Sequence, residues 1–164
     1  MPGTLKTAVL LVLKYSGAFR LARSLTSSGL RILCYHGIAV EDEHRFRGRL
    51  FMRSETFRSR MEQVRKLGYP LISLEEAVRG LADNSNPPAA VVLTFDDGWK
   101  RACDEALPWL AERGMPVTLY VTSYYASRQT QVFNVAIQYL FWATRVPRFN
   151  MEVLSTVTGC ELSG

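Results

Sequence analysis

The chain of 164 residues contains 48% hydrophobic and 21% charged residues, with 20 Lys and Arg against 15 Asp and Glu. This length suits one domain with a sizeable core, and the apolar content excludes a wholly disordered chain. The cysteines, Cys34, Cys103 and Cys160, form no Cys-x-x-Cys pair, which excludes a zinc knuckle or disulfide framework and favours a reducing compartment.

The first 28 residues predict an N-terminal amphipathic helix. Its apolar residues recur at helical spacing: Leu5, Val9, Val12, Phe19 and Ala22. The apolar run 7–13 is far shorter than the roughly 20 residues needed to cross a bilayer. Because Lys6 and Lys14 flank this run, a signal peptide or a membrane-surface anchor is the alternative. No convincing cleavage site follows, which favours a cytoplasmic location.

The charge is unevenly distributed. Residues 1–66 hold 13 Lys and Arg and 5 Asp and Glu, a net charge of +8, whereas residues 67–164 hold 7 and 10, a net charge of −3. The basic excess concentrates in residues 45–66, where a solvated helix face is the ordinary interpretation. The alternative is a surface for nucleic acid or anionic glycans, with Phe46, Phe51 and Phe57 interleaved among the cations.

Residues 30–81 predict one strand and two helices. Residues 30–36 form a short apolar strand with a polar end, and the charged residues 37–53 form a loop. Helical periodicity then runs from Phe57 to Leu67, where Gly68 ends the helix. After an extended piece at 69–72, a capping box at 73–76 opens a helix that reaches about Leu81.

The second half continues this alternation. After a loop at 83–88, residues 90–95 form an apolar run typical of a strand buried on both faces. A helix over 100–112, kinked at Pro108, leads to a strand over 117–122. Residues 132–145 and 150–158 favour helices. Alternating strands and helices predict an α/β fold with parallel strands.

Two adjacent carboxylates follow the buried strand directly. Asp96 and Asp97 come where side chains gather at the carboxyl end of a parallel sheet, and Gly98 permits a sharp turn after them. Like charges this close favour either a raised pKa or a bound cation, whose water one carboxylate would deprotonate. An Asp-Asp-Gly turn with helix-capping aspartates is an equally good interpretation from the chemistry alone.

Three blocks in order resemble the polysaccharide deacetylases, the NodB-homology or carbohydrate esterase 4 family. Residues 94–98, Thr-Phe-Asp-Asp-Gly, resemble the first motif of that family. Residues 32–38 are similar to its Tyr-His-x-Ile first strand, and residues 116–121 resemble the strand that follows the motif. The resemblance covers roughly residues 30–125.

This resemblance implies a distorted (β/α) barrel that removes acetyl groups from a polysaccharide or an amino sugar. Asp96 would be the general base, and Asp97 would bind a divalent metal, most often zinc. Tyr35 and His36 would lie near the floor of the pocket, and Trp99 would flank the sugar. For His36 and Trp99 the alternatives are a structural, hydrogen-bonded histidine and an aromatic that only packs.

The chain also departs from the family pattern. The later motifs supply two metal-binding histidines and a catalytic histidine, but this sequence holds only His36 and His44, both before the aspartates. Arg145-Val146-Pro147 matches the letters of the Arg-x-Pro motif without its context. We therefore expect residues 29–164 to be the N-terminal portion of the domain, partial in its barrel, with the missing C-terminal part as its partner.

Three expectations follow from this interpretation. Residues 1–164 alone would be inactive or poor as a hydrolase and would bind zinc weakly, since a catalytic zinc takes three protein ligands. Nucleic acid is not the expected partner, and a membrane surface is a further candidate partner through the N-terminal helix. The alternative function is a degenerate, non-catalytic module that binds carbohydrate or nucleic acid through residues 45–66.

Overall fold

The computed structural model describes residues 2–144, and the contacts within the chain divide it into two units between Gln129 and Thr130. The first unit contains the strands and the helices up to α7 (Ser123–Arg128). Of the second unit, helix α8 (Phe133–Ala143) is described. The helix expected over 150–158, the Arg-x-Pro match at 145–147 and Cys160 lie outside the described residues.

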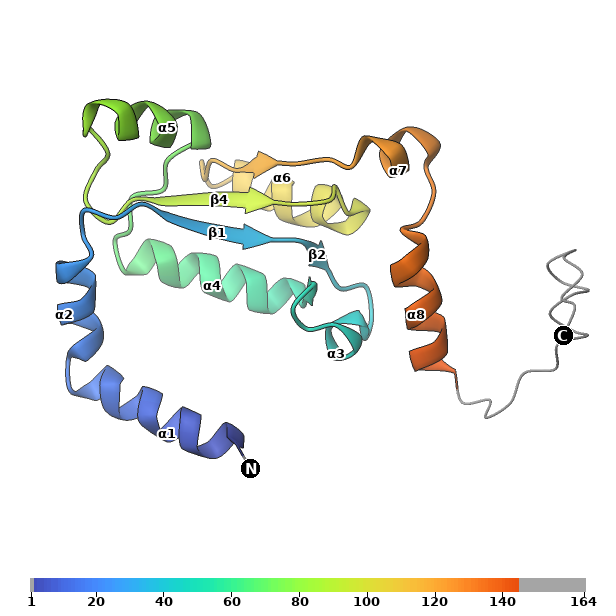
Figure 1. The fold of residues 1–164 in the computed structure, drawn as a ribbon, viewed down its shortest axis with the longest axis horizontal. Helices are drawn as coiled ribbons and strands as arrows, with labels where there is room; N and C mark the ends of the chain where they lie inside the picture. Colours follow the sequence, from blue (N-terminus) through green and yellow to red (C-terminus); the bar gives the residue numbers. More distant parts are fainter. Residues whose placement is uncertain (1, 145–164) are drawn as a thin grey trace, which may run out of the picture. The chain divides into compact units, whose positions relative to one another are not determined.

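A three-stranded parallel sheet organises the first unit (Figure 1). Strand β4 (Val91–Phe95) lies between β1 (Arg31–Tyr35) and β5 (Thr118–Leu119). In the register, Tyr35 pairs with Phe95, and Phe95 pairs with Leu119, so the three strands end at the same edge. The α/β class with parallel strands is confirmed. The sheet is small and open within the described residues, and the expected partial barrel is not confirmed.

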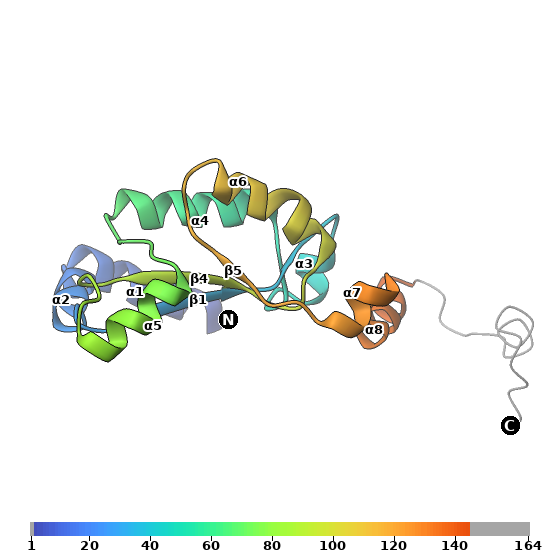
Figure 2. The ribbon, with the colours of Figure 1, turned by 90° about the horizontal axis from the view of Figure 1, so that it is seen from above.

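The core lies on one face of this sheet. Figure 2 shows α4 (Ser54–Lys66) and α6 (Leu107–Ala111) together on that face, with α5 (Leu74–Asp83) on the opposite side. Because strand side chains alternate, every second residue of β1 and β4 points into this core. The buried cluster joins three residues of β4 to the helices: Val91, Leu93, Phe95, Phe57, Met61, Ala102, Ala106 and Leu110. On the other face, Ile32 is 55% exposed.

The segment 37–53 is more ordered than the sequence predicts. Two short strands, β2 (Gly37–Ile38) and β3 (Phe51–Met52), pair in parallel, with helix α3 (Glu43–Phe46) between them. Each strand is two residues long, too short to produce a hydrophobic period. Their pairing is stabilised by tertiary burial of Ile38 and Phe51 instead.

The helix expected over 100–112 also differs from the prediction, because part of it is π-helical. Residues Ala102–Ala106 form a π-helical turn, η1, that continues directly into α6. The wider turn places Pro108 in the first turn of α6, where a residue without an N–H is tolerated. Strand pairing in β5 involves only Thr118 and Leu119, two residues of the six that the pattern predicts.

The N-terminal segment forms two helices instead of one. Helix α1 (Pro2–Tyr15) ends before Gly17, whose φ of 78° is a left-handed conformation, and α2 (Ala18–Leu25) follows. The Arg23 guanidinium on α2 donates to the Leu67 carbonyl at 2.6 Å and stacks over the Tyr69 ring at 4.1 Å. No described helix combines the length and apolarity required to span a membrane.

The capping box at the start of α5 is confirmed and provides a stability prediction. Glu76 N donates to Ser73 Oγ at 3.1 Å, and Ser73 N donates to the Glu76 carboxylate at 2.8 Å. Ser73→Ala leaves the Glu76 N–H without this acceptor. We expect it to lower the free energy of unfolding by about 1 kcal/mol, measured by urea denaturation. An unchanged denaturation midpoint would mean that α5 adds nothing to the cooperative unit.

The same capping box makes stability depend on pH. Hydrogen bonds from the Ser73 backbone and side chain lower the pKa of Glu76 below its usual value. The carboxylate therefore stabilises the fold above its unfolded-state pKa, and this contribution is lost as the pH falls through the lowered pKa. Glu76→Gln is expected to reduce the loss of unfolding free energy as the pH falls into the acidic range, measured by urea denaturation at a series of pH values. Glu75→Gln on the same turn is the matched control.

Candidate active site

The carboxyl ends of β1 and β4 bring the polar candidates together. Asp96 N donates to the Tyr35 carbonyl at 2.8 Å, which extends the β1–β4 pairing by one step past the strands. His36 and Asp96 therefore leave adjacent strands at the same edge of the sheet. This is the edge where parallel α/β sheets carry functional side chains.

One cluster of three different donor atoms forms at this edge. Cys34 Sγ lies 3.1 Å from Asp96 Oδ2, and His36 Nε2 lies 4.0 Å from the same oxygen. The thiol, imidazole and carboxylate donor atoms all lie within 4.8 Å of one another. The His36 and Asp96 side chains are 33% and 37% exposed, so solvent reaches the cluster.

The cluster also affects the cysteine itself. Burial raises the pKa of the Cys34 thiol above its ordinary value, and its hydrogen bond to the Asp96 carboxylate raises it further. The thiol therefore stays protonated and donates a hydrogen bond to the Asp96 carboxylate. A sulfur, a nitrogen and an oxygen donor together suit a borderline-soft divalent cation such as zinc.

Asp97 faces a different set of neighbours. Its φ of 72° and the φ of 72° at Gly98 turn the chain sharply after β4. A Cβ at Gly98 would lie 3.0 Å from Val121, so the turn also depends on the small size of glycine. Asp97 Oδ2 accepts a hydrogen bond from Trp99 Nε1 at 3.1 Å. The left-handed backbone thus separates the two carboxylates, and each contacts its own partner.

A hollow lies beside both carboxylates. It has a volume of about 400 Å³ and is lined by Asp96 and Asp97 together with residues 120–122, which follow β5. This volume is within the range of roughly 300–1,000 Å³ typical of small-molecule sites. An open hollow lined by two carboxylates can bind a polar ligand, and a carboxylate there can accept a proton from water.

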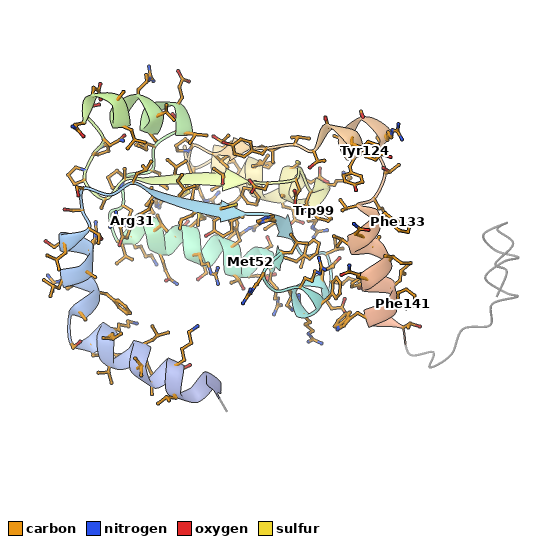
Figure 3. All side chains as sticks on the ribbon, in the orientation of Figure 1. Arg31, Met52, Trp99, Tyr124, Phe133 and Phe141 are labelled. Carbon is orange, nitrogen blue, oxygen red and sulfur yellow. The ribbon has the colours of Figure 1, made fainter. Side chains whose placement is uncertain are left out.

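Two other residues predicted for the site, Tyr35 and Trp99, pack against aromatic side chains. Tyr35 packs its ring against Phe57 and Phe95 on the core face, with centroids 5.2 and 5.6 Å apart, and burial raises the pKa of its hydroxyl. Trp99 packs against Phe51 at 4.9 Å, and Figure 3 shows it beyond the carboxyl end of β4. Their substrate-binding roles, and that of His36, stay predictions.

Sequence reasoning missed Cys34 and the residues that follow β5. The signal for Cys34 was available: it lies two positions before His36, and side chains two apart on a strand point to the same face. Tyr120, Val121 and Thr122 offered no comparable signal. Their position depends on where β5 ends beside Asp97, with Thr122 N donating to the Asp97 carbonyl at 3.4 Å.

The chain was compared with known proteins. Residues 83–139 match the family model for polysaccharide deacetylase. The de-N-acetylase from Aggregatibacter actinomycetemcomitans is 24% identical to this chain, with a TM-score of 0.50. The matched region covers 58% of this chain and 38% of the de-N-acetylase chain. The Streptococcus pyogenes deacetylase PplD, solved in complex with acetate, is 28% identical to this chain, with a TM-score of 0.54. The matched region covers 62% of this chain and 46% of the PplD chain.

These matches confirm the resemblance found in the sequence. No curated protein matches the chain. The family model begins at Asp83 and therefore includes the Asp96-Asp97-Gly98 turn but not the Tyr35-His36 segment. The chain spans less than half the length of either solved structure.

Proposed function

We propose, from the match of residues 83–139 to the polysaccharide deacetylase family model, that the chain contributes to the hydrolysis of acetyl groups on a polysaccharide or amino sugar. The observation that carries this proposal is the hollow of about 400 Å³ with Asp96 and Asp97 on its wall. An acetamido or acetyl ester group is small enough to enter such a hollow.

The proposed chemistry requires one carboxylate to act as a base. The oxygen of a water molecule attacks the acetyl carbonyl carbon, and its proton moves to a carboxylate oxygen. The carbon–nitrogen or carbon–oxygen bond then breaks, acetate is released, and the leaving amine or alcohol takes up a proton. The family resemblance assigns the base role to Asp96.

The family also implies a metal ion bound through Asp97, and the described residues do not fit that arrangement. Asp97 Oδ2 accepts from the Trp99 indole, and within residues 2–144 no His, Cys or carboxylate joins Asp97 in a group of three ligand atoms. A catalytic zinc takes three protein ligands and an open position. We therefore derive no step through a metal at Asp97.

The proposal is tested by ligand binding, because hydrolysis by residues 1–164 alone is expected to be slow. Two-dimensional NMR would follow the backbone amides as N-acetylglucosamine oligomers are added. We expect shifts at residues 96–98 and 120–122, and smaller shifts with the matching deacetylated oligomers. Acetate release over long incubation, measured enzymatically, should require Asp96, with Asp104→Asn as the exposed-carboxylate control. Equal responses to both oligomers would count against a deacetylase.

The alternative, a nucleic-acid surface on residues 45–66, has less support. Phe51 is 7% exposed and Phe57 is 1% exposed, so two of the three interleaved aromatic rings are unable to stack on bases. The glutamates Glu55 and Glu62 on the same helix pair with Arg53 and Arg65. These contacts favour a solvated helix face.

A second proposal concerns the N-terminal helices, which we propose to bind an anionic membrane surface. Residues 1–40 contain five Lys and Arg and no Asp or Glu. Helix α1 exposes apolar side chains along its length, including Leu5 at 72%, Val9 at 50% and Val12 at 67%. An apolar helix flanked only by cations is complementary to a leaflet of anionic lipid headgroups.

Vesicle sedimentation tests this second proposal. Binding is expected with vesicles containing phosphatidylserine, and it should weaken in high salt and on vesicles of phosphatidylcholine alone. Lys6→Glu with Lys14→Glu should abolish it. Arg58→Glu with Lys66→Glu makes the same charge change on α4 and should leave it intact. Equal binding to both kinds of vesicle, or a dimer formed through α1 without lipid, would refute the proposal.

A further inference from the structure

A segment rich in arginine lies at the same end of the sheet as the candidate site. Residues 44–53, which we call the arginine turn, contain four Arg and no Asp or Glu. The turn begins in α3 and ends after β3, and Figure 1 shows α3 beyond the carboxyl end of β1. Gly37 N donates to the Leu50 carbonyl at 2.9 Å, and Gly37 directly follows His36. A backbone hydrogen bond therefore joins the arginine turn to the strand end that carries the site.

Side-chain contacts join the same turn to the wall of the hollow. The Phe51 ring packs against Trp99 at a centroid distance of 4.9 Å. The Trp99 indole in turn donates to Asp97 Oδ2 at 3.1 Å, and Asp97 lines the hollow. Only two contacts thus separate β3, at the end of the arginine turn, from a residue of the hollow.

Two cations of the turn are available to a ligand. Arg45 and Arg49 are exposed, and within residues 2–144 their side chains form no hydrogen bond or ion pair. Arg53, in contrast, lies 3.6 Å from the Glu55 carboxylate. Acidic residues precede the turn at 41–43, and the Glu43 carboxylate there accepts hydrogen bonds from two backbone N–H groups. The two uncompensated guanidinium groups are therefore those of Arg45 and Arg49.

The backbone that carries these cations is ordered by local hydrogen bonds. Arg45 N donates to the Asp42 carbonyl at 2.7 Å. The Arg47 carbonyl accepts from Leu50 N at 2.9 Å and from Phe51 N at 2.8 Å. Because the backbone is already folded, a ligand has to order only the arginine side chains, which reduces the entropy cost of binding.

From this arrangement we propose that the arginine turn recognises anionic groups, carboxylate or phosphate, on the acetylated polysaccharide. The inference rests on the proposed function and names the substrate class of that site. Asp96 and Asp97 line the hollow, and like charge disfavours an anion beside them. The neutral acetyl group would therefore enter the hollow, and the anionic group would bind outside it. Arginine suits this role because its guanidinium presents paired N–H donors to carboxylate or phosphate oxygens.

Binding of oligosaccharides with and without negative charge tests the inference. Residues 1–164 would be titrated, with detection by NMR, with oligomers of alternating N-acetylglucosamine and glucuronate and with neutral N-acetylglucosamine oligomers of the same length. At low salt we expect at least threefold tighter binding of the uronate oligomer, with amide shifts at residues 45–50 as well as at 96–98. High salt should remove the preference, because exposed charges are screened. N-acetylglucosamine 6-phosphate against the unphosphorylated sugar shows whether phosphate is recognised instead.

Paired substitutions separate the arginine turn from the general charge of the protein. Arg45→Gln with Arg49→Gln should remove the preference for the anionic probe and leave binding of the neutral oligomer unchanged. Arg45→Lys with Arg49→Lys keeps the charge and should retain part of the preference. Arg58→Gln with Lys66→Gln removes the same charge from α4 and should leave the preference intact. Urea denaturation of each variant checks that it is folded.

Several results would overturn the inference. It fails if neither the uronate nor the phosphate probe binds more tightly than its neutral counterpart, or if the α4 variant loses the preference as fully as the arginine-turn variant. It also fails if an oligonucleotide shifts residues 45–50 with equal affinity and leaves 96–98 unchanged, which would indicate a separate nucleic-acid surface. In each case the neutral oligomers still report on the proposed deacetylase function. That function fails separately, through equal responses to acetylated and deacetylated oligomers.

Discussion

Phe95→Ala is expected to lower the free energy of unfolding by about 3–5 kcal/mol, because it leaves a cavity at the centre of the core. The Phe95 side chain is 0% exposed. Its ring contacts Tyr35 and Phe57, with centroids 5.6 and 5.4 Å away. These rings belong to a strand and a helix that cannot both move inward, so the cavity would collapse only in part.

The substituted residue also lies next to the candidate site. Phe95 immediately precedes Asp96, and its carbonyl accepts from Tyr120 N at 2.8 Å, next to the hollow. Urea denaturation followed by circular dichroism measures the loss. Ile32→Ala, at a position 55% exposed on the opposite face of the sheet, is the control and should cost less than about 1 kcal/mol. Equal losses in both variants would contradict the described core.

Gly37→Ala is expected to destabilise the protein by about 1–3 kcal/mol through steric overlap. A Cβ added at Gly37 would overlap the ring of Phe51, which is 7% exposed. The Phe51 ring also packs edge to face against Trp99, at a centroid distance of 4.9 Å. Because Phe51 is buried and packs against Trp99, we expect the overlap to shift the β2–β3 pairing or the Trp99 ring.

Gly29→Ala is the matched control for this steric effect. A Cβ at Gly29 would meet the Thr26 carbonyl oxygen at 3.4 Å, an ordinary contact distance. The expected change in unfolding free energy is below about 1 kcal/mol, and urea denaturation of both variants measures the difference. If Gly37→Ala were as stable as Gly29→Ala, the close packing of β2 against Phe51 would be incorrect.

The elements that sequence reasoning found were those with strong local signals. The apolar run 90–95 predicted β4, and the Ser73–Glu76 capping box predicted the start of α5. The two-residue strands β2 and β3 had no such signal, because their pairing depends on contacts between segments more than ten residues apart. Similarly, the break between α1 and α2 depends on a single glycine inside an otherwise continuous helical pattern.

For the candidate site, the sequence by itself determined that two carboxylates would follow a buried strand, because an apolar run, Asp96-Asp97 and Gly98 are adjacent in the chain. Only the tertiary structure decided what each carboxylate faces. Parallel pairing with β1 brings Cys34 and His36 to Asp96 across sixty or more positions of sequence, and the left-handed turn directs Asp97 toward Trp99. Strand register and backbone conformation are set by packing of the whole unit, which local residue patterns do not encode.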